Sequence, residues 1–568
     1  MKSLRLALIG ALAVARTAYA QQPPDVVVSD HYSNTAMGTG ALLSVTPSST
    51  TILGSGNTAA GAGALSSNTT GFYNTASGAA ALKANTSGFN DVAIGYIALA
   101  ANTTGSDMIA IGSNTLSSNT TGGTNIALGT DALSSNTTGY NNYALGIDAL
   151  EVNTTGYGNL GIGTSALLHN TTGNDNVSIG IDTLSANTTG YFNVAIGSNA
   201  LNLNTTGIYN VAVGGFALDA NTTGRYNVGI GDYSLYSNTT AKDNVGIGFG
   251  ALYSNTTGSD NTAVGFYALL YDTTGYNNSA SGSFALVANT TGYSNIATGY
   301  YALRNNTTGA GNVAIGDSVL VANTTANSNI GIGTYALTAN TTGGGNTAAG
   351  QGALASNTTG YRNLAMGYQA GFNLTTGSNN IDIGNVGVAA EGNTIRIGAA
   401  QTKTYIAGIY GTPVTGSAVY ISSTGQLGVV TSSERFKTAI ASMGSNTEKL
   451  QRLRPVTFHL KTDPTGALQY GLIAEEVANV YPELVIRDEK GRIDGVRYDE
   501  LAPMLLNEVQ QQAAEIRDLK EQQQERIAAQ DRHSAAQDAK ISQLMGQLAE
   551  MYAAIDKLKA KHEFVALR

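Results

Sequence analysis

The stretch that decides the fold is NVAIGSNALNLNTTGIY, residues 193–209, because variants of it fill most of the chain. The glycine that closes its pentad, Gly197, recurs at a constant 17-residue spacing from Gly61 to Gly384. Nineteen such intervals give 20 units, and none contains an insertion or a deletion. A repeat of fixed length predicts that every unit completes the same turn of one repetitive architecture.

The chemistry of this unit predicts strands and turns rather than helices. Val194 and Ile196 are expected to point to one side of the chain and Ala195 to the other, which is the period of a β-strand. Residues 204–207, Asn-Thr-Thr-Gly, have the composition of a turn. A unit of this length with two glycine-bearing corners is too short for a pair of stacked helices.

The units are expected to stack on one another through their backbones. No proline occurs between Pro47 and Pro413, as required where each coil donates hydrogen bonds to the next. The predicted fold class is therefore mainly β, a parallel β-roll or β-solenoid rod over residues 57–398. An N-terminal segment, residues 21–56, precedes the rod and holds a first atypical repeat. We expect columns of Val or Ile, Ala and Leu in the interior of the rod.

Two other positions recur once in each unit. Stacked asparagines are expected to bond to one another along the rod, in a ladder that includes Asn68, Asn102 and Asn136. The position after the corner glycine is repeatedly aromatic, and a solvent-side stack is favoured there over an aromatic binding strip. N-glycosylation or a threonine face for ice binding is the less favoured interpretation of the Asn-Thr-Thr segments. The recurring tyrosines are Tyr140, Tyr157, Tyr191, Tyr276 and Tyr293.

Composition argues against several classes of function. The chain of 568 residues has 70 glycines, no cysteine and no tryptophan, and 12% of its residues are charged, which is unlike an ordinary globular enzyme. Its net charge is −9, and no basic stripe with interleaved aromatics occurs, so nucleic acid is not an expected partner. The acidic residues of the rod, such as Asp131, Asp148 and Asp182, are sporadic, so the carboxylates converging in a cleft that glycan cleavage needs are not expected.

The sequence predicts no metal site and no cofactor. Its histidines are scattered without the spacing of metal ligands. They are His31, His169, His459, His533 and His562.

The N-terminal residues have the pattern of a secretory signal peptide. Lys2 and Arg5 precede an apolar stretch at residues 6–14, and the small residues at positions 18 and 20 fit a peptidase cleavage site. We therefore expect residues 1–20 to be removed, with Gln21 as the mature start, and the protein to be secreted or held at the cell surface. The alternative is a membrane anchor, but the apolar stretch is shorter than the ~20 residues that span a bilayer. No membrane span is expected after signal cleavage.

A charged region begins near residue 432. It holds 19 of the 29 lysines and arginines, and residues 399–431 before it have the alternation of a β-rich neck. Beyond the neck, the pattern predicts a short helix near residues 447–453, a strand at 456–460 and a helix at 474–481. A long helix is expected to begin at about Asp499.

The long helix carries apolar residues at coiled-coil spacing, so a coiled coil is expected over residues 516–568. The apolar positions are Leu505, Val509, Ile516, Leu519, Ile541, Leu544, Leu548, Met551, Ile555 and Leu558. Polar residues occupy the seam between the two apolar groups, where the coiled coil is expected to be weak or broken. They are Gln523, Gln530, Ser534 and Gln537.

The repeats of residues 34–398 resemble the heads of trimeric autotransporter adhesins, through their NVAIG-type pentads. In that family the repeats form left-handed parallel β-rolls that associate as trimers, so the resemblance implies a homotrimeric rod. The unit here is longer than that family's usual one, although the last interval, from Gly384 to Gly398, is shorter than the others and equals it.

Four blocks in order resemble a second family, the endosialidase-type intramolecular chaperone, which is the self-cleaving serine peptidase domain of phage tail spikes and fibres. The resemblance covers residues 432–515. It implies a homotrimeric chaperone that helps the upstream β-structure to assemble and then cuts itself off. The blocks are SSERFKTAI (432–440), LRPVTFHLK (453–461), YGLIAEEVANVYPELV (470–485) and VRYDELAPMLLNEVQ (496–510).

This second resemblance implies roles for three residues. The scissile bond is Thr431–Ser432, the nucleophile is Ser432 and the general base is Lys437. Ser433 stands where the family commonly has aspartate, and only Ser432 keeps the five-residue step to Lys437. The alternative interpretation is a polar linker before a helix, with Ser433 as its N-cap.

A lysine can act as a base only when it is neutral. A free lysine has a pKa near ~10.4, so such a role near neutral pH requires a pKa lowered by about 3 units, or roughly 4 kcal/mol. We expect the packing of chains in a trimer to supply this, with repulsion from Arg435 in addition.

The sequence therefore predicts an exported trimeric fibre or adhesin-like surface protein with a self-cleaving chaperone. The peptidase would act once on its own chain and on no external substrate. Other copies of the chain are the expected partners, and a cell-surface or glycan ligand is left open. The alternative is a phage-type tail fibre or tail spike that binds or cleaves glycans, against which the expected signal peptide argues.

Overall fold

The computed structural model describes residues 28–48, 50–407, 418–422, 425–429, 431–488 and 490–563. The expected signal peptide, residues 1–20, and the mature start at Gln21 lie outside the described residues. The chain divides into two units, Met1–Tyr405 and Ile406–Arg568.

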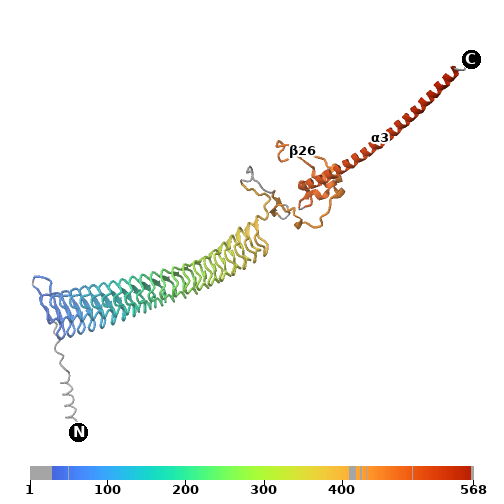
Figure 1. The fold of residues 1–568 in the computed structure, drawn as a ribbon. Coiled ribbons are helices and arrows are strands. Elements are labelled where there is room, and N and C mark those ends of the chain that lie inside the picture. Colours follow the sequence, from blue (N-terminus) through green and yellow to red (C-terminus); the bar gives the residue numbers. More distant parts are fainter. Residues whose placement is uncertain are drawn as a thin grey trace, which may run out of the picture. The chain divides into compact units, whose positions relative to one another are not determined.

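The first unit is a parallel β-solenoid, which confirms the predicted fold class (Figure 1). Its strands pair in parallel with their neighbours in chain order, apart from β1, which is antiparallel to β2. Paired positions lie one repeat apart through most of the rod, as in the pairing of Val194 with Val211. The strands are β1 (Val28–Ser29), β2 (Thr35–Met37), β3 (Thr58–Ala60), β4 (Thr75–Ser77), β5 (Val92–Ile94), β6 (Ile109–Ile111), β7 (Ile126–Leu128), β8 (Tyr143–Leu145), β9 (Leu160–Ile162), β10 (Val177–Ile179), β11 (Val194–Ile196), β12 (Val211–Val213), β13 (Val228–Ile230), β14 (Val245–Ile247), β15 (Thr262–Val264), β16 (Ser279–Ser281), β17 (Ile296–Thr298), β18 (Val313–Ile315), β19 (Ile330–Ile332), β20 (Thr347–Ala349), β21 (Leu364–Met366), β22 (Ile381–Ile383) and β23 (Ile395–Ile397).

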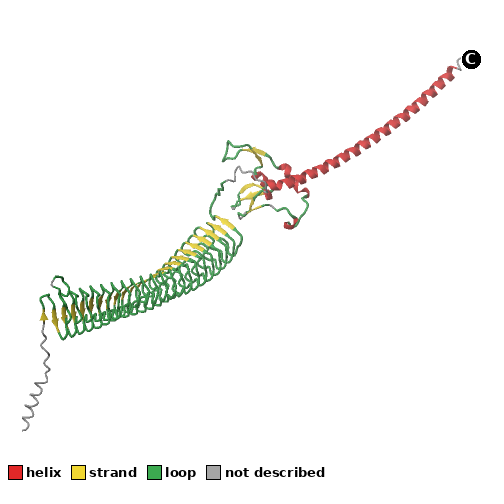
Figure 2. Cartoon of the chain, turned by 60° about the vertical axis from the view of Figure 1, so that its left-hand side comes forward, coloured by secondary structure: helices red, strands yellow, loops and turns green. Residues whose placement is uncertain are grey.

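Each coil has one short strand, and turns form the rest of its circumference (Figure 2). The turns are also tied to the next coil, because Leu201 N donates to Ala217 O at 3.0 Å and Thr205 N donates to Thr222 O at 2.9 Å. Backbone hydrogen bonds therefore run between coils on the turns as well as on the strands, which fits the long stretch without proline.

The pentad glycine closes the strand and turns the corner. At Gly197 the backbone has a φ of 129°, in the region that favours glycine. A Cβ at this position would lie 2.5 Å from the carbonyl oxygen of Gly214 in the next coil. The recurrence of this glycine thus follows from the close approach of successive coils.

The interior of the rod differs from the expectation in one respect. Ala195, Ala200 and Leu201 are fully buried, whereas Ile196 keeps 38% of its surface exposed. The expectation that Val and Ile columns fill the interior is therefore wrong. The strand does alternate, but its alanine side faces the thin core, which has no room for larger strand side chains, and its Val and Ile side faces outward.

The predicted asparagine ladder is confirmed, and a second one runs beside it. Asn204 Nδ2 donates to Asn187 Oδ1 at 2.9 Å, in the column of Asn68, Asn102 and Asn136. In the second column, Asn193 Nδ2 donates to Asn176 Oδ1 at 3.1 Å and to Gly207 O at 2.9 Å. Both columns are buried, so a lost rung would leave unsatisfied polar groups at about 1–3 kcal/mol each.

The second unit combines small antiparallel sheets with helices. Three pairs of strands, β24 with β25, β26 with β27 and β28 with β29, are antiparallel. Leu450, Val477, Tyr481, Leu484 and Val496 are among the buried residues of its core. The elements are β24 (Tyr420–Ile421), β25 (Leu427–Gly428), η1 (Glu434–Phe436), η2 (Gly444–Arg452), β26 (Val456–Phe458), β27 (Gln469–Gly471), α2 (Ala474–Val480), η3 (Pro482–Leu484), β28 (Val485–Arg487), β29 (Ile493–Val496) and α3 (Tyr498–Glu563).

The elements expected in this unit are found, with one change of type. The predicted strand at 456–460 corresponds to β26, the helix at 474–481 to α2 and the long helix to α3. The predicted short helix near 447–453 is the 3-10 helix η2. α3 continues unbroken through the glutamine-rich middle, since glutamine is a good helix former. Within the residues that the structure describes, no helix combines the length and apolarity that crossing a bilayer requires.

Candidate active site

The serine and lysine singled out in the sequence lie in contact. Lys437 Nζ donates a hydrogen bond to Ser432 Oγ at 3.3 Å. The single turn of η1 joins the two residues, and Lys437 N donates to Glu434 O at 2.9 Å as the turn closes. The five-residue step thus brings a nitrogen base to a hydroxyl, the arrangement that activates a serine nucleophile.

Ser433 occupies the N-cap position of η1 but does not cap it through its side chain. Its φ of −68° and ψ of 140° are those of an extended residue, and its side chain makes no cap hydrogen bond. Its carbonyl oxygen instead accepts from Phe436 N at 3.0 Å. Side-chain capping therefore gives no separate explanation for the serine pair.

The surroundings of the dyad are open and partly apolar in the single chain. Ser432 and Lys437 are exposed, and so are the side chains of Phe436 and Ile440. The Arg435 guanidinium lies over the Phe436 ring, 4.6 Å from its centroid. A basic group and an apolar surface therefore flank the two residues, and neither is covered by the described part of the chain.

The segment beyond the dyad is fixed by contacts between its helices. Arg454 pairs with Glu476 at 2.5 Å, which joins the loop before β26 to α2 and lowers the pKa of the Glu476 carboxyl. Tyr481 Oη donates to Asn446 O at 3.1 Å. These contacts and the shared apolar core make the last three of the four blocks that carry the family resemblance parts of one small domain.

Comparison with protein families agrees with this organisation. Residues 432–486 match the family model described as the chaperone of endosialidase. The predicted resemblance is confirmed over this segment, hereafter the endosialidase-chaperone segment. The match begins at Ser432 and contains the first three of the four blocks. A search of curated proteins found no match to the chain.

The endosialidase-chaperone segment is anchored to α3 by a polar cluster that the sequence analysis did not identify. Thr447 Oγ1 donates to Glu508 Oε2 at 3.3 Å, and Asn507 Nδ2 donates to Thr447 Oγ1 at 2.6 Å. Gln451 Nε2 also donates to Glu508, at 3.0 Å. Since some 60 residues separate the partners, no spacing in the sequence signals their contact.

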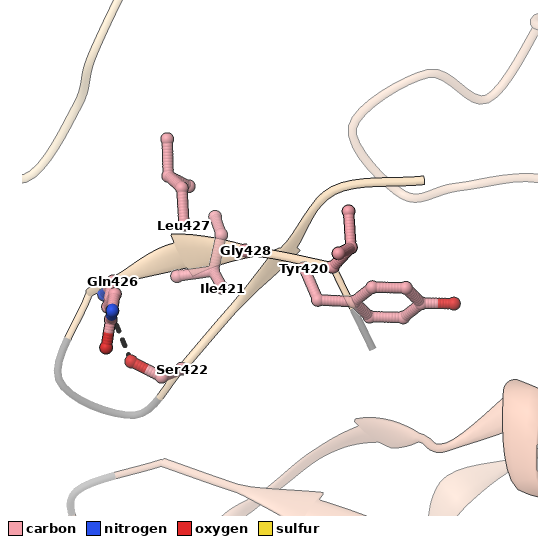
Figure 3. A pocket seen from close by; sticks show the side chains of 7 residues that line it. Tyr420, Ile421, Ser422, Gln426, Leu427 and Gly428 are labelled. Carbon is pink, nitrogen blue, oxygen red and sulfur yellow. Dashed lines mark hydrogen bonds between the residues drawn. The ribbon is translucent and has the colours of Figure 1, made fainter. Parts of the chain in front are cut away.

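An apolar hairpin precedes the dyad. The turn between β24 and β25 is closed by Gln426 N, which donates to Ser422 Oγ at 3.0 Å (Figure 3). A shallow hollow of about 340 Å³ lies along the hairpin, and Leu427 and Val429 beside it are exposed. The hollow contains no acid, base or nucleophile besides hydroxyls, so it has the character of a packing surface.

His459 Nδ1 contacts the Gly466 carbonyl at 3.0 Å and is exposed. Among the residues that the structure describes, no group of three or more His, Cys, Asp or Glu side chains is arranged to hold a metal ion.

Proposed function

We propose that this chain forms a trimeric fibre whose C-terminal region guides assembly and then cuts its own backbone at Thr431–Ser432. The observation that carries the proposal is the coincidence of the family match with the serine and lysine contact. The match begins at Ser432, and Lys437 Nζ lies 3.3 Å from its hydroxyl oxygen.

The proposed chemistry is an acyl shift followed by hydrolysis. Neutral Lys437 takes the proton of Ser432 Oγ as that oxygen attacks the carbonyl carbon of Thr431. The peptide bond breaks, the Ser432 nitrogen receives the proton from Lys437, and an ester joins Thr431 to Ser432 Oγ. Water then hydrolyses the ester, releasing the Thr431 carboxylate and restoring the hydroxyl. Each chain reacts once and consumes one water.

The need for a neutral lysine supports coupling between cleavage and assembly. An exposed ammonium is stabilised by water, and burial or a neighbouring positive charge favours its neutral form. Lys437 is exposed in the single chain, so we infer that other copies must cover it. The exposed Phe436 and Ile440 side chains next to it offer a surface for that contact.

The rod supports self-association through an apolar stripe. The in-register strands stack along one side of the solenoid (Figure 2), so their outward side chains form one column. Exposed apolar patches of this extent are rare on monomers, and we infer that the stripe packs against the stripes of two other copies. Its exposed members include Ile94, Ile111, Leu128, Ile196, Ile230, Ile247 and Ile315.

The long helix supports the same conclusion. α3 runs from Tyr498 to Glu563, and most of its residues are exposed. Its apolar residues at coiled-coil spacing, such as Leu544, Leu548 and Ile555, are exposed as well. Isolated helices gain little stability in water, so a trimeric coiled coil of three α3 helices is the proposed partner arrangement.

A chaperone that fixes chain alignment suits this rod. Three identical chains with a 17-residue repeat can pair out of register by whole coils, and parallel β-structures search slowly and expose edges meanwhile. A C-terminal trimer formed first removes that ambiguity. We further propose export to the cell surface, on the composition of residues 1–20.

A second candidate is a phage-type tail fibre or tail spike. The family match favours it equally, because it concerns only the C-terminal segment. Export distinguishes the two candidate functions, since the N-terminal pattern of Lys2, Arg5 and an apolar stretch is typical of secreted proteins.

Intact-mass spectrometry of the purified full-length chain tests the proposal. We expect two products whose masses place the cut between Thr431 and Ser432. A chain that stays whole after trimer formation, or a cut at another bond, would contradict it.

A further inference from the structure

Aromatic side chains in successive coils of the rod stack face to face. At the position after the corner glycine, Tyr140 and Tyr157 have ring centroids 4.9 Å apart and an interplanar angle of 5°. Tyr276 and Tyr293 repeat this arrangement at 4.9 Å and 3°. The stack predicted from the sequence is thus present in pairs, and one coil step brings two rings into parallel contact.

This ladder has one rung missing between two aromatic rungs. Tyr157, Asn174 and Tyr191 occupy the same position in three successive coils. The middle coil is held by Asp175 N, which donates to Tyr157 O at 3.0 Å, and by Phe192 N, which donates to Asn174 O at 3.1 Å. Tyr157 and Tyr191 therefore flank a position where the ring is absent.

A hollow of about 230 Å³ occurs at this place. It is lined by Tyr157, Asn174, Asp175, Tyr191 and Phe192. Both flanking tyrosines are 37% exposed, so their rings are reachable from solvent. We call this hollow the rung slot.

The polar residues of the rung slot leave it open. Asn174 Oδ1 accepts from Tyr157 N at 3.0 Å, which holds its side chain against the backbone. The Asp175 carboxylate lies against Gly158, where a Cβ would collide with Asp175 Oδ1. Within residues 50–407, which the structure describes without a gap, this carboxylate accepts no hydrogen bond and is available to a ligand.

The size of the rung slot suits one six-membered ring. Successive coils advance by about 4.8 Å, so two coil steps separate the flanking tyrosines by roughly 10 Å. A ring placed midway would lie about 5 Å from each, the usual centroid distance of stacked rings.

We propose that the rung slot binds one neutral pyranose ring of a saccharide between Tyr157 and Tyr191. A pyranose presents apolar C–H faces to the two tyrosines and hydroxyl donors at its edge to the Asp175 carboxylate. Sites that combine aromatic walls with a few placed polar groups are typical of small-ligand binding. A net charge of −9 on the chain and the carboxylate itself disfavour acidic sugars. This assignment goes beyond fibre assembly and self-cleavage and does not depend on them.

Saturation-transfer NMR on the full chain tests the assignment. The probes are the methyl glycosides of glucose, galactose, mannose and N-acetylglucosamine, with methyl N-acetylneuraminide and p-cresol for comparison. We expect at least one neutral glycoside to receive saturation, with a Kd on the order of 1–10 mM. Asn174→Tyr fills the slot with the residue type of the neighbouring rungs and should reduce the signal at least tenfold. Tyr191→Ala removes one wall and should weaken binding as well.

Two variants serve as controls. Tyr276→Ala removes a ring that stacks directly on its neighbour Tyr293 at 4.9 Å and should leave binding unchanged. Asp175→Asn keeps the shape of the rung slot but removes its negative charge, so the preference for neutral over acidic sugars should become smaller. The assignment is overturned if no neutral glycoside receives saturation, if Asn174→Tyr binds like the wild type while its circular dichroism is unchanged, or if the neuraminide or p-cresol binds as well as every neutral glycoside.

Discussion

Lys437 Nζ lies 3.3 Å from Ser432 Oγ, across the single 3-10 turn of η1. The contact closes within one chain, so the geometry of a Ser-Lys dyad does not need a partner. Under the proposed function its environment does need a partner, because both residues are exposed and a lysine base has to be neutral. Geometry and activation are therefore separate requirements, and variants can address them one at a time.

The dyad itself is tested by removing either member. Ser432→Ala deletes the nucleophile and Lys437→Ala the base, so each should slow cleavage by a factor of about 10³ or more. Lys437→Arg keeps a positive charge that cannot be lost and should be equally inactive. Denaturing gels should show only full-length chain. Ser433→Ala is the matched control and should be cut normally; a cut at Thr431–Ser432 in either alanine variant would remove the assignment.

A buried acid in the asparagine ladder should make the stability of the rod depend on pH. Asp272 takes the place of an asparagine and accepts from Asn289 Nδ2 at 2.7 Å. Its Oδ2 and the Asn255 Oδ1 have no hydrogen-bond partner in the described part of the chain, because the amide donor of the other rungs is missing. Burial raises the pKa of Asp272 to about 7.

The sign of this dependence follows from the proton count. The folded chain keeps the Asp272 proton up to about pH 7, whereas an unfolded aspartate loses it near ~3.9. The free energy of unfolding should therefore fall as pH rises from about 4 to about 7, and this contribution is lost above that range. Asp272→Asn restores the donor and should raise the free energy of unfolding at pH 8 by about 2–4 kcal/mol.

Denaturant titrations at pH 5 and pH 8 measure the effect. The difference in the free energy of unfolding between pH 5 and pH 8 should shrink in Asp272→Asn. A remainder comes from Asp91 and Asp382, whose pKa values burial raises to about 8 and about 6. Asp260→Asn, in an exposed position of the preceding coil, should change neither value. An unchanged pH dependence in Asp272→Asn would show that the acid is not held neutral in the rod.

The apolar stripe is tested by making it polar without changing the core. Ile196→Thr combined with Ile230→Thr keeps β-branched residues in the strands but removes apolar contact area. If the stripe is the interface between copies, each substitution should weaken trimer association by about 1–2 kcal/mol. The trimer fraction in sedimentation velocity should therefore fall. Leu203→Thr, in the turn and similarly exposed, is the control. Equal trimer fractions in all three proteins would refute the assignment of the stripe.

Close approach of successive coils predicts unequal costs for two glycine substitutions. Gly197→Ala places a Cβ 2.5 Å from the Gly214 carbonyl oxygen, whereas Gly63→Ala meets nothing within 4 Å, although both have positive φ. Gly63→Ala carries the backbone strain of about 1 kcal/mol of a left-handed residue. Gly197, with a φ of 129°, lies outside the positive φ values that other residues adopt in this rod, so Gly197→Ala is strained further and also separates two coils. The midpoint temperature of thermal unfolding should therefore drop markedly for Gly197→Ala and slightly for Gly63→Ala. Similar drops would mean that neither the close approach of the coils nor the φ of 129° makes Gly197 costly to replace.

The sequence was enough to predict the solenoid because its evidence repeats. The glycine spacing from Gly61 to Gly384 and the asparagines in the column of Asn204 repeat the same structural constraint from coil to coil. The sequence could not predict which face of the strand is buried. Alternation shows that the strand has two different faces, but it does not show which of them points inward. Ala195 is inside and Ile196 outside because leucines such as Leu201 fill the thin core and leave room only for a small side chain on the strand.

For the candidate site, the sequence predicted the residues and the structure adds their contact. The spacing of Ser432 and Lys437 fits one turn, which is local information. The contacts of Thr447 with Asn507 and Glu508 are not local, and polar residues so far apart leave no pattern in the chain. The missing rung at Asn174 is visible in the sequence only once the ladder is known to stack.

The most direct test of the central claim is to ask which assembly state contains the cut. Freshly made full-length chain is separated by sedimentation into monomer and trimer during the reaction, and each fraction is run on a denaturing gel. We predict product cut at Thr431–Ser432 in the trimer fractions alone, with intact chain in the monomer fractions. A monomer that splits at this bond as fast as the trimer would contradict the account.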